Sequence, residues 1–380
     1  MVDADRLRDT CLELVSIPSP TGDTSAVTER FGELLTDIGM TVELVRDFPG
    51  TPTLVGRLAG RGAGPRLVLC GHLDTVPIAH DPPRVENGRV YGRGSADMKG
   101  ALSCAAEVVR MLKATGDQFP GELVIVAIGL HEAPSGRGED LVHLLRDLGF
   151  QADGAIVCEL GGGGKLPVAH MGSATFEITV SRPGVPTHEL QTAAGTPHPL
   201  LAAGRVMDAI ATRSMRLAAV EHPLVGAETY FVGEVHGGDF YNRFPSSCRL
   251  VGTRRWAPTT SFQAVEEDFR RVLSGTARET GCRVDLELRK VRDSYRIDPS
   301  HPLVRALQAG YLEACGEPLE LVGSKIVADG AIWTAEGIPA VYYGPAGSGA
   351  HADVEYVQVD EMVRATRVYL STVRHYWRDA

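Results

Sequence analysis

Four short runs of apolar residues stand out in the sequence, and they predict buried strands. Apolar residues are continuous within each run, as is typical of parallel strands covered on both faces. Around the runs, apolar residues recur every three or four positions, which predicts amphipathic helices. Strands that alternate with helices indicate an α/β domain with right-handed crossovers. The runs are 67–70, 123–128, 155–158 and 340–343, and the predicted helices are 25–39, 100–113 and 361–377.

The middle of the chain follows a different pattern, in which apolar and polar residues alternate. Phe176, Ile178 and Val180 fall on one face of an extended chain, and residues 283–289 repeat the alternation. A period of two is typical of half-exposed antiparallel strands. We therefore expect an inserted α+β domain, an antiparallel sheet with two helices, within a mostly parallel α/β domain. The helices are predicted near 196–211 and 261–279, the insert at 171–292, and the α/β domain at 1–170 and 293–380.

Composition and charge narrow the classes of partner. The chain has 380 residues and a formal net charge of −10, which argues against binding nucleic acid or an anionic membrane surface. No apolar stretch approaches the roughly 18 residues of a membrane span, and the N-terminus lacks the pattern of an export signal. Seven cysteines are scattered without a CxxC pair, which fits reduced thiols in the cytoplasm better than a disulfide framework.

Side chains of the types that bind metals follow each of the four apolar runs. In chain order these are His72, Glu132, Glu159 and, after a glycine-rich loop, His351. The carboxyl ends of parallel strands meet at one edge of a sheet, where ligands bind. Asp97 lies at a predicted junction between a loop and a helix and can join the others there. The sequence therefore predicts a metal site at this edge.

The predicted ligands are two imidazoles and three carboxylates, a mixed set that suits Zn²⁺ and also accommodates Co²⁺ or Mn²⁺. Five ligands exceed what a single open catalytic zinc requires. They fit two ions roughly 3.5–4 Å apart that share one bridging carboxylate. Asp74, two residues after His72, lies on the same side of an extended chain. Its carboxylate is therefore predicted to accept the far ring N–H of a metal-bound His72.

The motifs that contain these residues are GHLDTVP, GRGSADMKGA, the acid after AIVC, and GAHADVEYV. Together they resemble the M20 metallopeptidase family, which includes acetylornithine deacetylases, succinyl-diaminopimelate desuccinylases, aminoacylases and glutamate carboxypeptidases. The resemblance runs from about residue 5 to the C-terminus. It implies a zinc-peptidase-like catalytic domain with two zinc ions per chain. One ion is expected at His72, Asp97 and Glu159, and the other at Asp97, Glu132 and His351, with Asp97 bridging.

The same resemblance assigns roles to the insert. It implies a lid that also forms the interface of a homodimer. His188, in SRPGVPTHEL, matches a lid histidine that reaches the site of the partner subunit and polarises the scissile carbonyl. Asn242, in YNRFP, and Arg255 match a segment that grips the substrate carboxylate, a task that suits the two-pronged guanidinium. Asp329, in VADGAIW, resembles a family Asp near the substrate pocket.

The chain departs from the family pattern at His131. The usual pair there is Glu-Glu, a general base followed by a metal ligand, whereas this chain has His131-Glu132 followed by Ala133. Either Glu132 is the ligand and His131 fills the position of the base, or Glu132 is the base and the ligand is lost at Ala133. Spacing favours the first alignment, because His131 and Glu132 lie 34 and 35 residues after Asp97, as in the family.

A neutral imidazole can act as the base, because its unperturbed pKa near 6.5 suits proton transfer at neutral pH. Three other interpretations of His131 stay open: an extra metal ligand, a residue that adapts the site to another substrate, or a sign that hydrolysis has been lost. The resulting hypothesis is a cytoplasmic dizinc amidohydrolase that acts on an N-acyl amino acid or small peptide with a free carboxylate. The alternatives are a dipeptidase or carboxypeptidase of the same family, and a non-hydrolytic protein on the same scaffold.

Overall fold

The structure is a computed structural model that describes residues 2–116, 118–132, 135–159 and 163–378. Ala133, on which the second alignment of the His-Glu pair depends, lies outside these ranges. The chain divides into two compact units. The first comprises Met1–Val168, Ile297–Gly323 and Ala328–Ala380, and the second comprises Ala169–Arg296 and Ser324–Val327.

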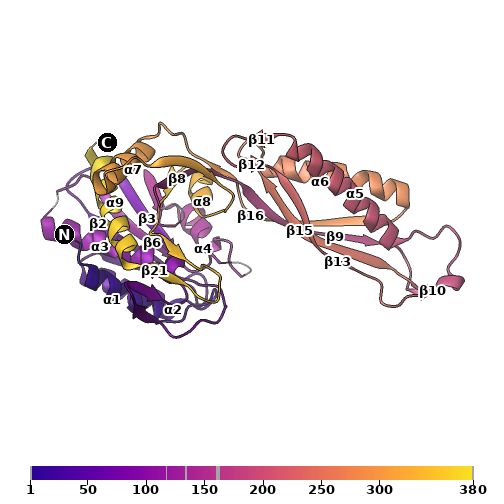
Figure 1. The fold of residues 1–380 in the computed structure, drawn as a ribbon, viewed down its shortest axis with the longest axis horizontal. Coiled ribbons are helices and arrows are strands. Elements are labelled where there is room, and N and C mark those ends of the chain that lie inside the picture. The colour runs from indigo at the N-terminus through magenta and orange to yellow at the C-terminus, as the bar shows by residue number, and fades with distance from the viewer. Residues whose placement is uncertain (1, 117, 133–134, 160–162, 379–380) are drawn as a thin grey trace. The chain divides into compact units, whose positions relative to one another are not determined.

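A six-stranded mixed sheet forms the centre of the first unit (Figure 1). Its four parallel strands coincide with the four apolar runs, because strands covered on both faces carry apolar residues without interruption. Two antiparallel strands extend the sheet at one edge. In spatial order the strands are β1 (Thr41–Val45), β2 (Thr53–Ala59), β6 (Glu122–Ile128), β3 (Arg66–His72), β7 (Gly154–Val157) and β19 (Ala340–Tyr342).

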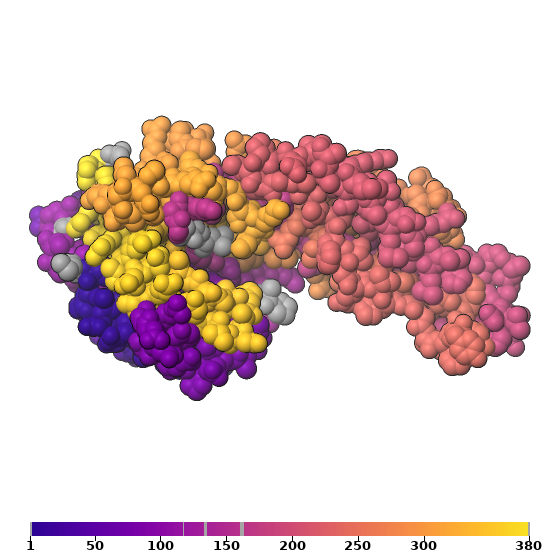
Figure 2. Space-filling model, viewed as in Figure 1, coloured from indigo at the N-terminus to yellow at the C-terminus, as the bar shows by residue number. Residues whose placement is uncertain are grey.

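Helices from both ends of the chain pack around this sheet. The C-terminal helix α9 (Val359–Arg378) contacts α7 (Pro302–Cys315), α3 (Gly100–Thr115) and α1 (Ala4–Val15). Figure 2 shows the consequence on the surface, where N-terminal residues in indigo lie beside C-terminal residues in yellow. The unit also contains α2 (Ser25–Asp37), α4 (Glu139–Val142) and α8 (Gly330–Ala335), and two five-residue helical segments, Ser95–Lys99 and His143–Asp147.

A second, smaller sheet of the first unit connects distant loops. Its order is β20 (Gly347–Ser348), β21 (Tyr356–Gln358), β5 (Arg89–Tyr91) and β4 (Arg84–Glu86). The sheet brings the segment that contains His351, between β20 and β21, to the segment that contains Asp97, between β5 and α3.

The second unit contains an antiparallel four-stranded sheet. Its order is β13 (Thr229–Gly237), β15 (Ser247–Trp256), β9 (Gly172–Ser181) and β16 (Arg283–Arg292). Alternate side chains of β9 and β15 are buried, and helices α5 (Pro199–Ala218) and α6 (Phe262–Thr280) cover that face (Figure 1). The predicted fold class, an α/β domain with an α+β insert, is therefore confirmed.

The remaining elements are short. β8 (Lys165–His170) pairs with β17 (Tyr295–Arg296), and β18 (Glu320–Ser324) belongs to the same small sheet. β10 (Thr187–His188) pairs with β14 (Arg243–Phe244), and β11 (Glu221–His222) pairs with β12 (Gly226–Ala227). Of the helices in the described ranges, none has an apolar stretch long enough to span a bilayer.

Candidate metal centre

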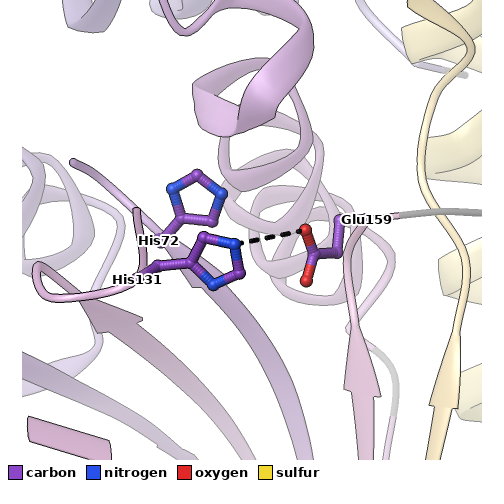
Figure 3. A group of neighbouring side chains, drawn as sticks. All are labelled: His72, His131 and Glu159. Carbon is purple, nitrogen blue, oxygen red and sulfur yellow. Dashed lines mark ion pairs between the residues drawn. The ribbon is translucent and has the colours of Figure 1, made fainter. Parts of the chain in front are cut away.

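Three neighbouring parallel strands deliver side chains to one edge of the six-stranded sheet. His72 is the last residue of β3, Glu159 comes two residues after β7, and His131 comes three residues after β6. Figure 3 shows the rings of His72 and His131 lying against each other, with Glu159 facing them. The ring centroids are 4.1 Å apart with an interplanar angle of 2°, and Nε2 of His131 is 4.0 Å from Oε2 of Glu159.

Asp97 joins this group to the other predicted ligands. Its Oδ1 lies 3.1 Å from Nε2 of His72, and its Oδ2 lies 3.5 Å from Nε2 of His351. The same nitrogen of His351 is 3.0 Å from Oε1 of Glu132. One carboxylate thus faces two different imidazoles with its two oxygens, as a ligand that bridges two cations must. The structure brings all five predicted metal ligands together.

The main chain at His351 is strained. Its φ of 62° lies in the left-handed region, which costs a residue other than glycine about 1–3 kcal/mol and is concentrated at functional sites. The contacts of the ring with Asp97 and Glu132 are the ones that this conformation makes. The conformation of His351 is therefore consistent with a functional role for the ring.

The carboxylates of the cluster are crowded and poorly hydrated. Within the described residues, Asp97, Glu132 and Glu159 form no ion pair with Lys or Arg; their charged partners are imidazoles. Burial, with repulsion from Asp329 and Asp97, raises the pKa of Glu159 to about 7. Burial also opposes ionisation of Asp97, but hydrogen bonds from His351 and His72 outweigh it and hold the pKa of Asp97 below its usual range.

These residues fit two divalent cations. The donors are nitrogen and oxygen atoms of the kinds that Zn²⁺, Co²⁺ and Mn²⁺ accept. Oε1 of Glu159 is buried and has no hydrogen-bond partner in the part of the chain that the structure describes. Such an oxygen is costly unless a positive charge or a donor compensates it. A cation held by Glu159 and His72 would supply that compensation.

The hydrogen bonds of the Asp74 carboxylate differ from the prediction. Nδ1 of His72 is 2.9 Å from the main-chain oxygen of Asp74 and 3.6 Å from its carboxylate, so the nearer acceptor is the main chain. The fully buried carboxylate instead accepts the N–H groups of His131 and Glu132, at 3.2 and 2.8 Å, and the hydroxyl of Thr21 at 2.8 Å. Asp74 therefore fixes the main chain at the His-Glu pair.

Asp329 contacts His131. Its Oδ2 is 2.7 Å from Nδ1 of the imidazole, and its side chain is 3% exposed. Burial alone lowers the pKa of His131, but attraction by Asp329 and Glu159 outweighs it and raises the pKa to about 9. Cations held by the same carboxylates would lower the pKa of His131, because positive charge disfavours an imidazolium.

Glu355 is a buried acid of the site that the sequence did not indicate. Its side chain is 1% exposed and lies 2.7 Å from Nη1 of Arg93. It also accepts main-chain N–H groups of residues 94, 96 and 97 at 3.0, 2.9 and 3.0 Å. Glu355 thereby ties the loop of Asp97 to the loop of His351, four residues earlier. The only signal in the sequence is its position inside the motif GAHADVEYV.

In the second unit, the predicted catalytic residue His188 and the predicted substrate-binding residue Asn242 lie together. β10 ends at His188, and Asn242 immediately precedes its partner strand β14. Nδ2 of Asn242 is 3.2 Å from Nε2 of His188, and the imidazole is exposed. The pair therefore presents polar groups to solvent in this unit.

Arg255 lies on β15 between Ser173 of β9 and Thr229 of β13. Its side chain is half-buried, and burial lowers its pKa. Among the described residues, the guanidinium forms no ion pair, whereas the neighbouring Arg254 is buried and paired with Glu228. Arg255 is therefore available to an anionic ligand.

Side chains of metal-ligand type that gather at the carboxyl edge of parallel strands fit a metal-dependent hydrolase. The sequence matches peptidase family M20/M25/M40 over residues 68–375. The chain belongs to this family, which confirms the family and the enzyme class predicted from the motifs.

Relatives and solved structures are similar to this chain over nearly its whole length. The N-formyl-4-amino-5-aminomethyl-2-methylpyrimidine deformylase of Bacillus subtilis is 25% identical, over 97% of this chain and 93% of the relative. The succinyl-diaminopimelate desuccinylase of Methylobacterium nodulans is 26% identical, over 96% and 94%. The fold is similar to that of aminopeptidase PepT from Bacillus cereus, with a TM-score of 0.83 at 19% identity over 99% of both chains. A dinuclear metal-binding M20 peptidase of Bacillus subtilis gives a TM-score of 0.73 at 16% identity, over 99% of both chains.

Proposed function

We propose that the protein hydrolyses the amide bond of an N-acyl amino acid, or of a small peptide, that carries a free carboxylate. The observation that carries the proposal is the position of Asp97, whose two oxygens face two imidazoles within a cluster of five metal-ligand side chains. Two full-length relatives are named for removal of a formyl and a succinyl group. They favour an acylated amine over a longer peptide as substrate.

The ligands divide into two sets that share Asp97. We assign His72 and Glu159 to one ion and His351 and Glu132 to the other, as the family resemblance implies. This assignment is supported by the proximity of the donor atoms of His72, Asp97 and Glu132, which lie within 4.8 Å of one another, and by the 3.0 Å contact of His351 with Glu132. We assign zinc to both positions, with Co²⁺ or Mn²⁺ as substitutes. Cations held by these residues would polarise the amide carbonyl and lower the pKa of a bound water molecule.

His131 is the candidate base. Its Nδ1 is engaged by Asp329, which leaves Nε2 to face Glu159 and the rest of the cluster. A nitrogen in that position can take a proton from the attacking water and return it to the leaving amine. Asp74 keeps the imidazole in place by binding the main-chain N–H of His131.

We assign recognition of the substrate to three residues of the second unit. Arg255 is assigned to the substrate carboxylate, because its half-buried guanidinium has the geometry for a bidentate contact. Asn242 is assigned to the same end of the substrate. His188 is assigned to the developing oxyanion in the site of a partner subunit.

A homodimer through the second unit is part of this proposal. β13 is an edge strand of its sheet, and an unpaired edge is a ready surface for pairing with a second copy. Phe231 and Val235, both on β13, are 62% and 50% exposed. We place the protein in the cytoplasm, because all seven cysteines are unpaired and six of them are buried.

The test is a substrate panel with metal analysis. Purified protein is loaded with zinc, its metal content per chain is measured, and N-formyl, N-acetyl, N-succinyl and N-carbamoyl amino acids are compared with di- and tripeptides. We expect two ions per chain, hydrolysis within the acyl series, loss of activity with a chelator and recovery on adding zinc. Peptides as the better substrates would favour the dipeptidase or carboxypeptidase alternative. Full activity without any transition metal would refute the proposal.

Mixing two inactive variants tests whether His188 acts in the site of the partner subunit. His188→Ala and Asp97→Asn are each expected to be inactive alone. Their heterodimer contains one site with intact ligands and an intact His188 from the other subunit, so mixed subunits should recover about a quarter of wild-type activity. No recovery in verified heterodimers would remove the role of His188 in trans.

The non-hydrolytic alternative rests on His131, which stands where the family has its usual base. Inactivity of the zinc-loaded wild type on the whole panel, with activity appearing in His131→Glu, would favour it.

A further inference from the structure

The carboxylate of Asp329 contacts His131 and does not cap the helix that follows it. It occupies the position before α8, where an Asp side chain commonly caps the first turn by accepting main-chain N–H groups. The side chain of Asp329 makes no such cap bond. Its Oδ2 is instead 2.7 Å from Nδ1 of His131, which is 198 residues away in the chain.

The ring of His131 is held at two further points. One face stacks on His72, with centroids 4.1 Å apart and an interplanar angle of 2°. Nε2 lies 4.0 Å from Oε2 of Glu159 (Figure 3). A ring flip would exchange the nitrogens and carbons at both edges, so it would break the contact with Asp329. The ring therefore has one favoured orientation.

We infer that Asp329 is a positioning residue that accepts the Nδ1 proton of His131 and so fixes the tautomer with its lone pair on Nε2. A carboxylate can only accept, so the nitrogen that faces it must carry the hydrogen. In the neutral imidazole the other nitrogen, toward Glu159, then carries the lone pair and can take a proton. The role given to His131 rests on the proposed function, but the tautomer itself does not.

This inference reassigns Asp329, which the sequence placed near the substrate. The side chain is 3% exposed and its carboxylate is engaged with His131. A residue with so little accessible surface has little to offer a substrate directly. Its effect on the reaction therefore passes through the imidazole.

The chain offers a matched control. His143 and Asp147 form a second pair of the same kind, with Nδ1 and Oδ2 2.8 Å apart, but there the carboxylate is 59% exposed. Asp329→Asn and Asp147→Asn are the same chemical change at a buried and at an exposed pair. Asn keeps the shape of Asp but presents an NH₂ group that can donate to the ring nitrogen, which favours the opposite tautomer.

The first measurement needs no substrate. Histidine ring nitrogens are labelled with ¹⁵N in the zinc-loaded protein, and the signals of His131 are assigned by their absence in His131→Gln. We expect hydrogen on Nδ1 and none on Nε2 in the wild type, and loss of this pattern in Asp329→Asn but not in Asp147→Asn. Hydrogen on Nε2 in the wild type, or an unchanged pattern in Asp329→Asn, would overturn the inference. Inactivity on every substrate would refute the proposed function and leave this result standing.

The second measurement is kinetic. With an active substrate, Asp329→Asn should lower kcat about 10–100-fold, as is typical when a group that orients an active-site histidine is removed, and leave KM within about twofold. In a His131→Gln background the same substitution should have no further effect, because the residue through which it acts is gone. An equal loss in both backgrounds, or a rise in KM instead of a fall in kcat, would show that Asp329 acts on the substrate itself.

Discussion

Replacing Glu355 by Gln tests whether a buried carboxylate holds the bridging Asp97 in place. Oε1 of Glu355 accepts the N–H groups of Ala96 and Asp97, and Oε2 accepts that of Gly94 and a guanidinium N–H of Arg93. Each oxygen thus faces two donors. Gln has one oxygen and one NH₂ group. In either orientation of its amide, the NH₂ group faces two of these four donors, which are then left without an acceptor.

The expected cost follows from this count. A buried donor without an acceptor costs about 1–3 kcal/mol, so two of them cost about 2–6 kcal/mol before the loop relaxes. We expect a net loss of about 3 kcal/mol in the free energy of unfolding, which lowers Tm by about 6–12 °C in a unit of this size. Because one of the lost bonds is to the N–H of Asp97, zinc affinity should also fall, by about 10–100-fold.

The assay combines urea unfolding of the metal-free protein with zinc titration against a competing chelator. Glu86→Gln is the control, because Glu86 is exposed on β4 and its carboxylate, among the described residues, forms an ion pair only with Arg84, at 3.3 Å. A change at such a site is expected to stay within about 0.5 kcal/mol. If Glu355→Gln unfolds at the same urea concentration as Glu86→Gln and binds zinc equally well, the four hydrogen bonds do not hold the Asp97 loop.

Three other changes give separate tests. Asp97→Asn should lose both zinc ions on dialysis, whereas Glu159→Gln should lose one, as measured by metal content per chain; equal losses would contradict a bridging Asp97. Arg255→Lys should raise KM about tenfold and change kcat less, because Lys cannot form the bidentate contact with a carboxylate; an unchanged KM would remove Arg255 from the substrate site. Burial raises the pKa of Asp140 to about 7 from 3.8, so the stabilisation by its neutral form is complete below about pH 4 and is lost as the pH rises toward 7. Asp140→Asn should therefore gain stability relative to wild type between about pH 5 and pH 8 in urea unfolding; a constant difference would contradict this.

The parts of the fold that the sequence predicted are those with a long, regular pattern. The four apolar runs became the parallel strands, and the predicted helix at 261–279 became α6 (Phe262–Thr280). The helix predicted at 196–211 starts later, at Pro199, and continues to Ala218. In the additional turns Arg213 and Arg216 interrupt the apolar pattern, and only Leu217 packs against the core, so the periodicity is too weak there to predict where the helix ends.

The parts that it missed have no periodic signal. β2 (Thr53–Ala59) is interrupted by Gly56 and Arg57 and is recognisable only by its pairing with β6. The small sheet that joins the loops of the site is built from strands of two or three residues. Strands so short carry no alternation that can be read from the chain. Tertiary contacts alone define them.

The residues of the site were also predictable only in part. Ligand types at strand ends were visible because parallel strands share a carboxyl edge. The contacts of Glu355 with the Asp97 loop and of Asp329 with His131 join segments about 200 or more residues apart. An acid in the sequence reads as exposed by default, and only the structure reveals that these two are buried. The residues that hold the ligands are thus harder to predict than the ligands.

The exchange of a carboxylate for an imidazole at position 131 changes two properties of the site together. It changes the group that takes the proton, and it removes one negative charge beside Glu159 and Asp97, which weakens the attraction for cations. His131→Glu therefore restores a carboxylate base and should also bind zinc more tightly.

Higher activity of His131→Glu at limiting zinc would report only metal loading. At saturating zinc, with His131→Gln as the neutral variant without a base, the comparison isolates proton transfer. We expect His131→Gln to lose most of its kcat at full metal occupancy; a Gln variant as active as wild type would exclude His131 as the base.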